Sequence, residues 1–126
     1  MSDWVWVSID RVLAAHAEQL ARFGGPAGVR DMGALESALA RPENLAVYGD
    51  PDLAALAASY AFGLARNHAF VDGNKRIAWL TARFFIARNG GTLAFDREDA
   101  FRMVMGLAAG DNSEEVVSKW FRERLT

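Results

Sequence analysis

The chain has 126 residues, which is the usual size of one domain and is long enough to bury a core. Apolar residues make up 52% of it and charged residues 24%, as in ordinary globular proteins, and the net charge of −2 argues against a dedicated nucleic-acid-binding protein. The absence of cysteine excludes disulfides and thiolate metal sites.

Neither export nor membrane insertion is indicated by the pattern of apolar residues. Residues 1–10 lack a basic region followed by an apolar run, so they do not resemble a signal peptide. No uninterrupted apolar stretch approaches the roughly 20 residues that span a bilayer. We therefore expect a cytoplasmic protein that has no contact with a membrane.

Apolar residues recur at helical spacing through most of the chain, whereas the alternation typical of strands is scarce. The first helix is expected over residues 8–22, with the Ser8 hydroxyl as its cap, followed by a glycine-rich loop over residues 23–30. A short helix then begins after Asp31 and ends before Pro42, because a proline ring disfavours helical geometry in the preceding residue. Residues 42–50 are expected to be extended or irregular.

Asp50 and Pro51 predict the start of a central helix that runs to about Asn67. Aspartate is a good capping residue, and proline is favoured at the first helical position. The helix is rich in alanine and almost entirely apolar. Such a helix is typical of the centre of a fold, where other elements contact it on several sides.

The second half of the chain continues the helical pattern. A loop over residues 68–74 is followed by an apolar helix over residues 75–89. Asp96 and Ser113 are predicted to cap the last two helices, since each is followed by acidic residues that favour a helix N-terminus. The expected architecture is one all-α domain of about six helices over residues 1–126.

Polar groups are concentrated in the nine residues 68–76, between the two central helices. They comprise a base, a carboxylate, a glycine, an amide and two cations: His68, Asp72, Gly73, Asn74, Lys75 and Arg76. The backbone N–H groups that open the next helix have no intrahelical partner and can bind an anion, which Gly73 allows to approach closely. Two cations in this first turn oppose the helix dipole, and an anionic ligand would reverse that cost.

The same loop carries groups suited to catalysis. The Asp72 carboxylate is a hard ligand for Mg²⁺, which usually binds through one or two carboxylates together with substrate phosphates. The His68 imidazole can accept a proton from an attacking hydroxyl. Phe70 is expected to anchor the loop in the core, whereas Arg66 can either reach the site or simply end its helix. Together these residues predict phosphoryl or nucleotidyl transfer from a Mg-nucleotide.

Each signal alone also has a purely structural explanation. His68 fits a hydrogen-bonded histidine, Asp72 fits a helix cap, and Lys75 and Arg76 fit a solvated surface. A second histidine, His16, is expected to be packed and hydrogen-bonded inside the first helix. A non-catalytic module that recognises an anion or a partner is therefore the alternative from another class, while direct nucleic-acid binding is not expected.

The segment HAFVDGNKR (residues 68–76) resembles the signature of the Fic/Doc family. That signature is a histidine, a phenylalanine two residues on, an acid two further, then a small residue, asparagine, a variable residue and arginine. The likeness extends to residues 23–42, to residues 88–90 and to the closing helices with Trp120. The resemblance implies an all-α Fic/Doc fold over nearly the whole chain.

The same resemblance implies a role for each residue of the motif. His68 would be the general base on the hydroxyl of a target protein, and Asp72 would be the Mg²⁺ ligand. Gly73 would belong to the anion-binding turn. The nucleotide phosphates would be contacted by Asn74 and the two cations that follow it, Lys75 and Arg76.

Two positions make the motif similar to that of Doc-type toxins. AMP-transferring Fic enzymes carry glycine in place of Lys75 and a second arginine in place of Trp79. By resemblance, the nucleotide would place its γ-phosphate near His68, which makes the expected activity that of a protein kinase. The implied target is elongation factor Tu or another protein, the implied outcome is arrested translation, and AMP transfer at the same site is the alternative.

An inhibitor from outside the chain is the remaining expectation. Fic proteins often carry an inhibitory helix in which serine or threonine precedes a glutamate by four residues. No serine or threonine of this chain has glutamate at that spacing. By resemblance, the expected partner is therefore a Phd-like antitoxin.

Overall fold

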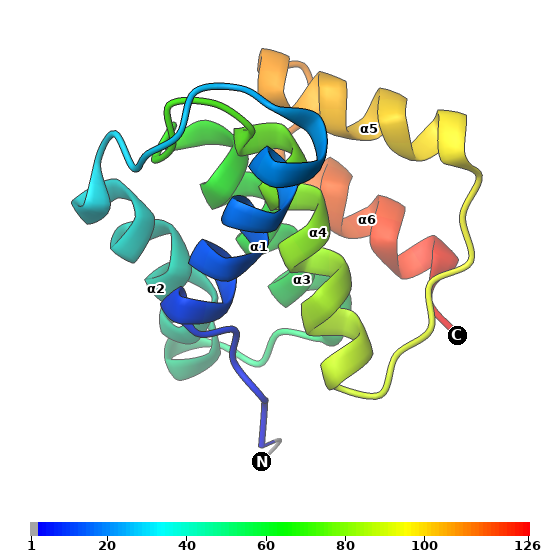
Figure 1. Cartoon of the computed structure of the whole chain (residues 1–126). Helices are drawn as coiled ribbons and strands as arrows, with labels where there is room; N and C mark the ends of the chain where they lie inside the picture. Colours follow the sequence, from blue (N-terminus) through cyan, green and yellow to red (C-terminus); the bar gives the residue numbers. More distant parts are fainter. Residues whose placement is uncertain (1–2) are drawn as a thin grey trace.

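The computed structural model describes residues 3–126, and this part of the chain folds into six helices around one core (Figure 1). The helices are α1 (Ile9–Phe23), α2 (Met32–Tyr48), α3 (Leu53–Arg66), α4 (Asn74–Arg88), α5 (Arg97–Ala109) and α6 (Glu114–Arg124). Extended pairing within residues 3–126 is limited to two isolated bridges. The predicted all-α fold is therefore confirmed.

Local signals set most of the helix starts. The side chains of Ser8, Asp96 and Ser113 accept hydrogen bonds from backbone N–H groups in the first turns of α1, α5 and α6, as the sequence predicts. The sequence also predicts the end of α1, where Gly24 adopts a φ of 75° that favours glycine.

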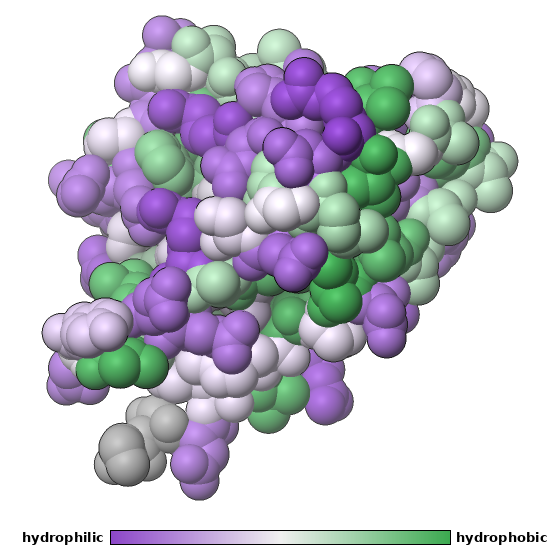
Figure 2. Space-filling model, turned by 90° about the vertical axis from the view of Figure 1, so that its left-hand side faces the viewer, coloured by the Kyte–Doolittle hydropathy of each residue, from purple (hydrophilic) through white to green (hydrophobic). Residues whose placement is uncertain are grey.

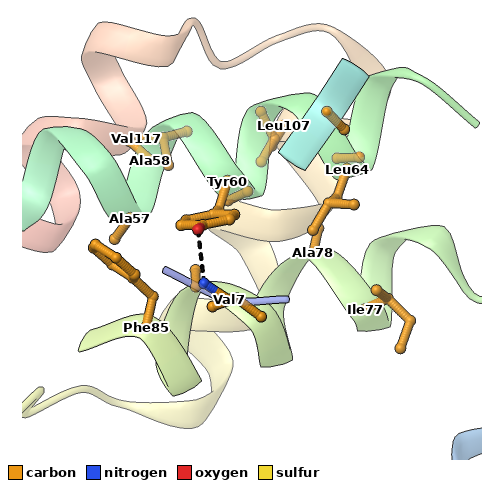
Figure 3. Packing of buried hydrophobic residues seen from close by; sticks show 14 of the residues in the cluster. Val7, Ala57, Ala58, Tyr60, Leu64, Ile77, Ala78, Phe85, Leu107 and Val117 are labelled. Atoms are coloured by element: carbon orange, nitrogen blue, oxygen red, sulfur yellow. Dashed lines mark hydrogen bonds between the residues drawn. The ribbon is translucent and has the colours of Figure 1, made fainter. Parts of the chain in front are cut away.

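The central element is α3, which contacts α2, α4, α5 and α6. Most of its alanines are buried and let neighbouring helices pack closely, as the view of Ala57, Ala58 and their surroundings shows (Figure 3). One such close approach is at Gly63, where an added Cβ would lie 3.3 Å from the Cα of Ala38 on α2. Large side chains such as Phe85 of α4 fill the remaining space.

The predicted end of the second helix before Pro42 is wrong, and so is the irregular segment predicted over residues 42–50. α2 continues through Pro42 to Tyr48. Proline removes one backbone hydrogen bond of the helix, but this ring is buried on the face of α2 that also buries Ala38 and Leu39. Tertiary packing against α3 therefore outweighs the local preference of the proline.

The start of the central helix lies two residues later than predicted. Asp52 caps α3, with its Oδ1 accepting from the N–H of Ala55 at 2.9 Å, and Asp50 and Pro51 precede the cap. The Asp52 carboxylate also binds the guanidinium of Arg122 on α6, at 2.7 and 3.0 Å. That hydrogen bond lowers the pKa of the Asp52 carboxyl below its ordinary value. A partner distant in sequence therefore favours Asp52 as the cap.

Residues 3–8, which have no regular secondary structure, cover one side of the core. Trp4 and Trp6 pack against the ring of Phe85, with centroids 6.0 and 5.8 Å away. The N–H of Val7 donates to the hydroxyl of Tyr60 at 3.0 Å (Figure 3). A hydrogen bond in the core thus fixes where this segment meets α1.

The outer surface mixes polar and apolar groups. On the face that carries α2, hydrophilic side chains dominate the upper centre and apolar side chains gather toward the right (Figure 2). Val47 and Tyr48 at the end of α2 are among the most exposed large apolar residues, at 73% and 88%. Among residues 3–126, no helix combines the length and the apolar character that crossing a membrane requires.

The Tyr60 hydroxyl provides a test of the core. Tyr60→Phe leaves the Val7 N–H without its acceptor and should lower the free energy of unfolding by about 1–3 kcal/mol near neutral pH. Burial raises the pKa of Tyr60 from 10.0 to about 12, so the folded state keeps a proton that the unfolded chain loses. The advantage of the wild type should therefore be complete below pH 10 and shrink toward pH 12. Denaturant unfolding of both proteins across this range measures it, and a pH-independent difference would contradict the assignment.

Candidate active site

The loop before α4 is fastened to the segment that follows α1. The two run side by side at the upper left of Figure 1. The carbonyl of Ala69 accepts hydrogen bonds from the N–H groups of Arg30 and Asp31 at 2.8 and 3.0 Å, and the N–H of Val71 donates to the carbonyl of Gly28 at 3.2 Å. The loop is therefore paired along its length with a segment about 40 residues away in sequence.

Asn74 closes the loop on itself. Its Oδ1 accepts from the N–H of Phe70 at 3.0 Å, and its Nδ2 donates to the carbonyl of Phe70 at 2.9 Å. One side-chain amide thus satisfies both backbone groups of a residue four positions earlier. We call this pair of bonds the Asn74 bracket. Both ends of the Asn74 amide bond to the backbone of Phe70, so the contact that the structure shows is one that closes the loop. The contact of Asn74 with a phosphate stays a prediction.

The predicted anchoring by Phe70 is confirmed. Its side chain is buried, and its ring stacks on the imidazole of His16 with centroids 3.9 Å apart. The Nε2 of His16 donates to the carbonyl oxygen of Asp72 at 2.9 Å, which requires the hydrogen to be on Nε2 because a carbonyl can only accept. His16 is therefore the packed, hydrogen-bonded residue that the sequence predicts, and it holds the loop from behind.

His68 lies at the exposed start of the loop in an unusual backbone conformation. Its φ of 50° is the one positive value at a non-glycine residue within residues 3–126. Its carbonyl accepts a hydrogen bond from the Nε of Arg30 at 3.0 Å, while the imidazole has no hydrogen-bond partner among those residues. Such backbone strain concentrates at functional sites, and nothing in the sequence indicates it.

The start of α4 leaves backbone donors available. Gly73 precedes the helix with a φ of 86°, and no side chain caps the first turn. The Oδ1 of Asp72 accepts from the N–H of Gly73 at 2.9 Å instead of reaching into α4. The N–H groups of the first turn are therefore free of a side-chain cap and suit an anion.

Two cations stand on this first turn without a carboxylate partner. Lys75 and Arg76 are exposed, and neither forms an ion pair within the described residues. The first turn of α4 contains no acidic residue. The guanidinium of Arg76 lies 4.4 Å from the centre of the exposed Phe23 ring at the end of α1. Positive charge at a helix N-terminus is unfavourable alone, so this arrangement favours an anionic ligand.

The Asp72 carboxylate suits an Mg²⁺ ion that is bound jointly by one protein carboxylate and the phosphates of a substrate. Its carboxylate is exposed, and its Oδ2 has no hydrogen-bond partner within residues 3–126. Across the same part of the chain, no three histidine or acidic side chains gather into a set that could hold a metal. A single carboxylate beside an anion site matches Mg²⁺, which keeps several waters and binds phosphates, and does not match an ion held by protein groups alone.

Arg66 does not lie with the loop. Its Nε donates to the carbonyl of Leu107 at 2.8 Å, and an Nη group donates to the carbonyl of Asn112 at 3.2 Å. Its guanidinium also stacks on Phe62, 4.6 Å from the ring centre. Of the two alternatives for Arg66, the structure shows the one in which it ends its helix, and it ties α3 to the end of α5.

Trp79 points into an aromatic cluster. It stacks on Phe121 with centroids 6.3 Å apart and meets Phe95 and Trp120 edge to face. The position that carries a second arginine in the AMP-transferring pattern is therefore filled here by a packed ring. It contributes no cation to the anion site.

The fold and the loop define a small all-α domain in which the uncapped start of a helix lies beside an exposed histidine and a carboxylate. A family model described as the Fic/DOC family matches residues 6–86. The chain therefore belongs to the Fic/DOC family, which confirms the resemblance seen in the motif.

The chain is also similar in sequence to two Doc proteins. A protein of Mycolicibacterium smegmatis named Toxin Doc is 52% identical over 77 residues, a match that covers 59% of this chain and 58% of that protein. A protein of Escherichia phage P1 named Protein kinase doc is 32% identical over 117 residues, which cover 92% of each chain. The likeness to the phage protein thus extends over most of the chain.

The Asn74 bracket can be tested by removing one bond or both. Asn74→Ala leaves the N–H and the carbonyl of Phe70 unpaired and should lower the free energy of unfolding by about 1–3 kcal/mol. Asn74→Asp keeps an acceptor for the N–H but sets an acceptor-only carboxylate oxygen against the Phe70 carbonyl near neutral pH, so it should be destabilised as well. Urea unfolding measures both variants. Wild-type stability in Asn74→Ala would show that the bracket does not hold the loop.

Proposed function

We propose that this protein is the toxin of a toxin–antitoxin pair and transfers the γ-phosphate of Mg-ATP to a hydroxyl of a translation factor. The observation that carries the proposal is the fastened loop, which presents His68, Asp72 and the uncapped start of α4 on one exposed turn. The names of the two relatives, one a toxin and one a protein kinase, support both parts of it.

Each group has one task in the proposed reaction. His68 accepts the proton of the target hydroxyl, whose oxygen then forms a bond to the γ-phosphorus as the bond to the ADP oxygen breaks. Asp72 would hold Mg²⁺, which neutralises phosphate charge when bound. The N–H groups of α4, with Lys75 and Arg76, stabilise the negative charge on the phosphates. Gly73 allows the backbone to approach them.

The choice of phosphate over AMP rests on two residues. Lys75 fills space that a glycine would leave for a phosphate group, so the nucleotide is expected to bind in the orientation that brings its γ-phosphate toward His68. Trp79 is packed among aromatic rings and supplies no second cation. AMP transfer at the same site is the second candidate, because the rest of the motif is common to both reactions.

The proposed setting follows from the family. The target is elongation factor Tu or another protein that carries a hydroxyl side chain, and its modification arrests translation in the cytoplasm. This chain lacks the self-inhibitory spacing in which serine or threonine precedes glutamate by four residues, so a separate Phd-like antitoxin would inhibit it. The antitoxin would cover the loop or compete with ATP.

Labelled ATP separates the two transfer reactions. The protein is incubated with elongation factor Tu and with ATP labelled at either the α- or the γ-phosphate. The proposal predicts that the γ-label is retained on the target and the α-label is not. Retention of the α-label would replace the kinase proposal with AMP transfer.

Catalysis itself is tested by two variants expressed in growing cells. His68→Ala removes the base and Asp72→Ala removes the metal ligand, so both should abolish growth arrest. Both side chains are exposed, and circular dichroism and thermal melting of the purified variants check that the fold is kept. Growth arrest that persists in both well-folded variants would favour the alternative class, a module that binds an anion or a partner without turnover.

A further inference from the structure

The turn Phe23-Gly24-Gly25, at the C-terminal end of α1, lies against two charged groups of the site, Arg76 and Asp72, neither of which forms an ion pair within residues 3–126. Phe23 meets Arg76, and Gly25 meets Asp72. The sequence pattern assigns no role to this turn beyond ending a helix. Its contacts with the loop give it a second one.

Gly25 leaves no room for a side chain beside the Asp72 oxygen that would bind a metal ion. A Cβ built on Gly25 would lie 2.7 Å from the Oδ2 of Asp72, well inside contact distance. Oδ2 is the oxygen left over for a ligand, because Oδ1 accepts the N–H of Gly73 at 2.9 Å. The backbone of Asp72 is held on the other side by His16. A methyl group at Gly25 would therefore turn the carboxylate rather than move the chain beneath it.

Phe23 is in contact with the cation. Its ring is 59% exposed, and its centre lies 4.4 Å from the Arg76 guanidinium carbon. This distance is that of a cation–π contact. An arginine on an exposed helix turn has many rotamers, and the ring favours those that keep the guanidinium beside the start of α4.

We propose that the turn Phe23-Gly24-Gly25 is a positioning element for the Mg-nucleotide site, in which Gly25 sets the direction of the Asp72 carboxylate and Phe23 holds the Arg76 guanidinium. The inference rests on the proposed function, because it assigns Mg²⁺ to Asp72 and phosphate to Arg76. Neither Gly25 nor Phe23 is catalytic. Each acts through the group that it contacts.

Gly24 offers a matched control for Gly25. Both glycines have positive φ, 75° and 108°, so alanine is strained at either position, but a Cβ at Gly24 would meet nothing within 4 Å. Binding of the non-hydrolysable ATP analogue AMP-PNP is measured by calorimetry, with Mg²⁺ and with EDTA. The ratio of the two dissociation constants isolates the contribution of the metal from that of the nucleotide alone.

The wild type should bind more tightly with Mg²⁺, and Asp72→Ala should lose that advantage. Gly25→Ala should reduce it by about tenfold or more, the loss typical when a group that orients a metal ligand is changed. Gly24→Ala should keep it. If Gly25→Ala keeps the Mg²⁺ advantage as Gly24→Ala does, the positioning role of Gly25 is overturned, whereas the proposed function is not affected. A wild type without any Mg²⁺ advantage, or an unchanged Asp72→Ala, would overturn the proposed function.

Phe23 gives a second test that does not depend on a strained backbone. Phe23→Leu keeps an apolar side chain but removes the aromatic ring, and should weaken AMP-PNP binding about two- to fivefold. Phe23→Tyr keeps the ring and should restore binding. In an Arg76→Ala background, Phe23→Leu should have no further effect. An equal loss with and without Arg76 would show that Phe23 does not act through the guanidinium and would overturn this half of the inference.

Discussion

Phe70 has a buried side chain and a backbone that must be paired, and these two requirements determine the loop between α3 and α4. Its ring lies beneath His16, and its N–H and carbonyl both bond to the amide of Asn74. An unpaired buried backbone group costs about 1–3 kcal/mol, so the loop has few alternatives of comparable free energy. The groups on either side of Phe70 are thereby held in one arrangement, with His68 and Asp72 directed outward.

The fixed loop carries features that destabilise the protein when no ligand is bound. His68 has a positive φ, and Lys75 and Arg76 add positive charge to the positive end of the α4 dipole. Local conflicts of this kind are expected at functional sites, where the rest of the fold offsets them. The buried alanine face of α3, packed on four helices, is the part of this fold that can do so. A bound polyphosphate would relieve the charge on α4.

Local chemistry made most of the fold and the motif predictable from the sequence. Capping residues such as Ser8 act on their own first turn, so their effect is visible in the sequence. The helix through Pro42 was not predictable, because it depends on close packing of α2 against Gly63 of α3. For the same reason the contact of Gly25 with Asp72 was missed, since it joins segments that the sequence does not place together.

Amide hydrogen exchange of the free protein tests the central claim, that the loop is preformed before any nucleotide binds. The decisive signals are the N–H of Phe70, bonded to Asn74, and the N–H of Val71, bonded to Gly28. The account predicts that both exchange as slowly as the core amides of α3 and α4, through opening of the whole domain. Exchange near the rate of an unfolded chain at both positions, with α3 and α4 still protected, would contradict it.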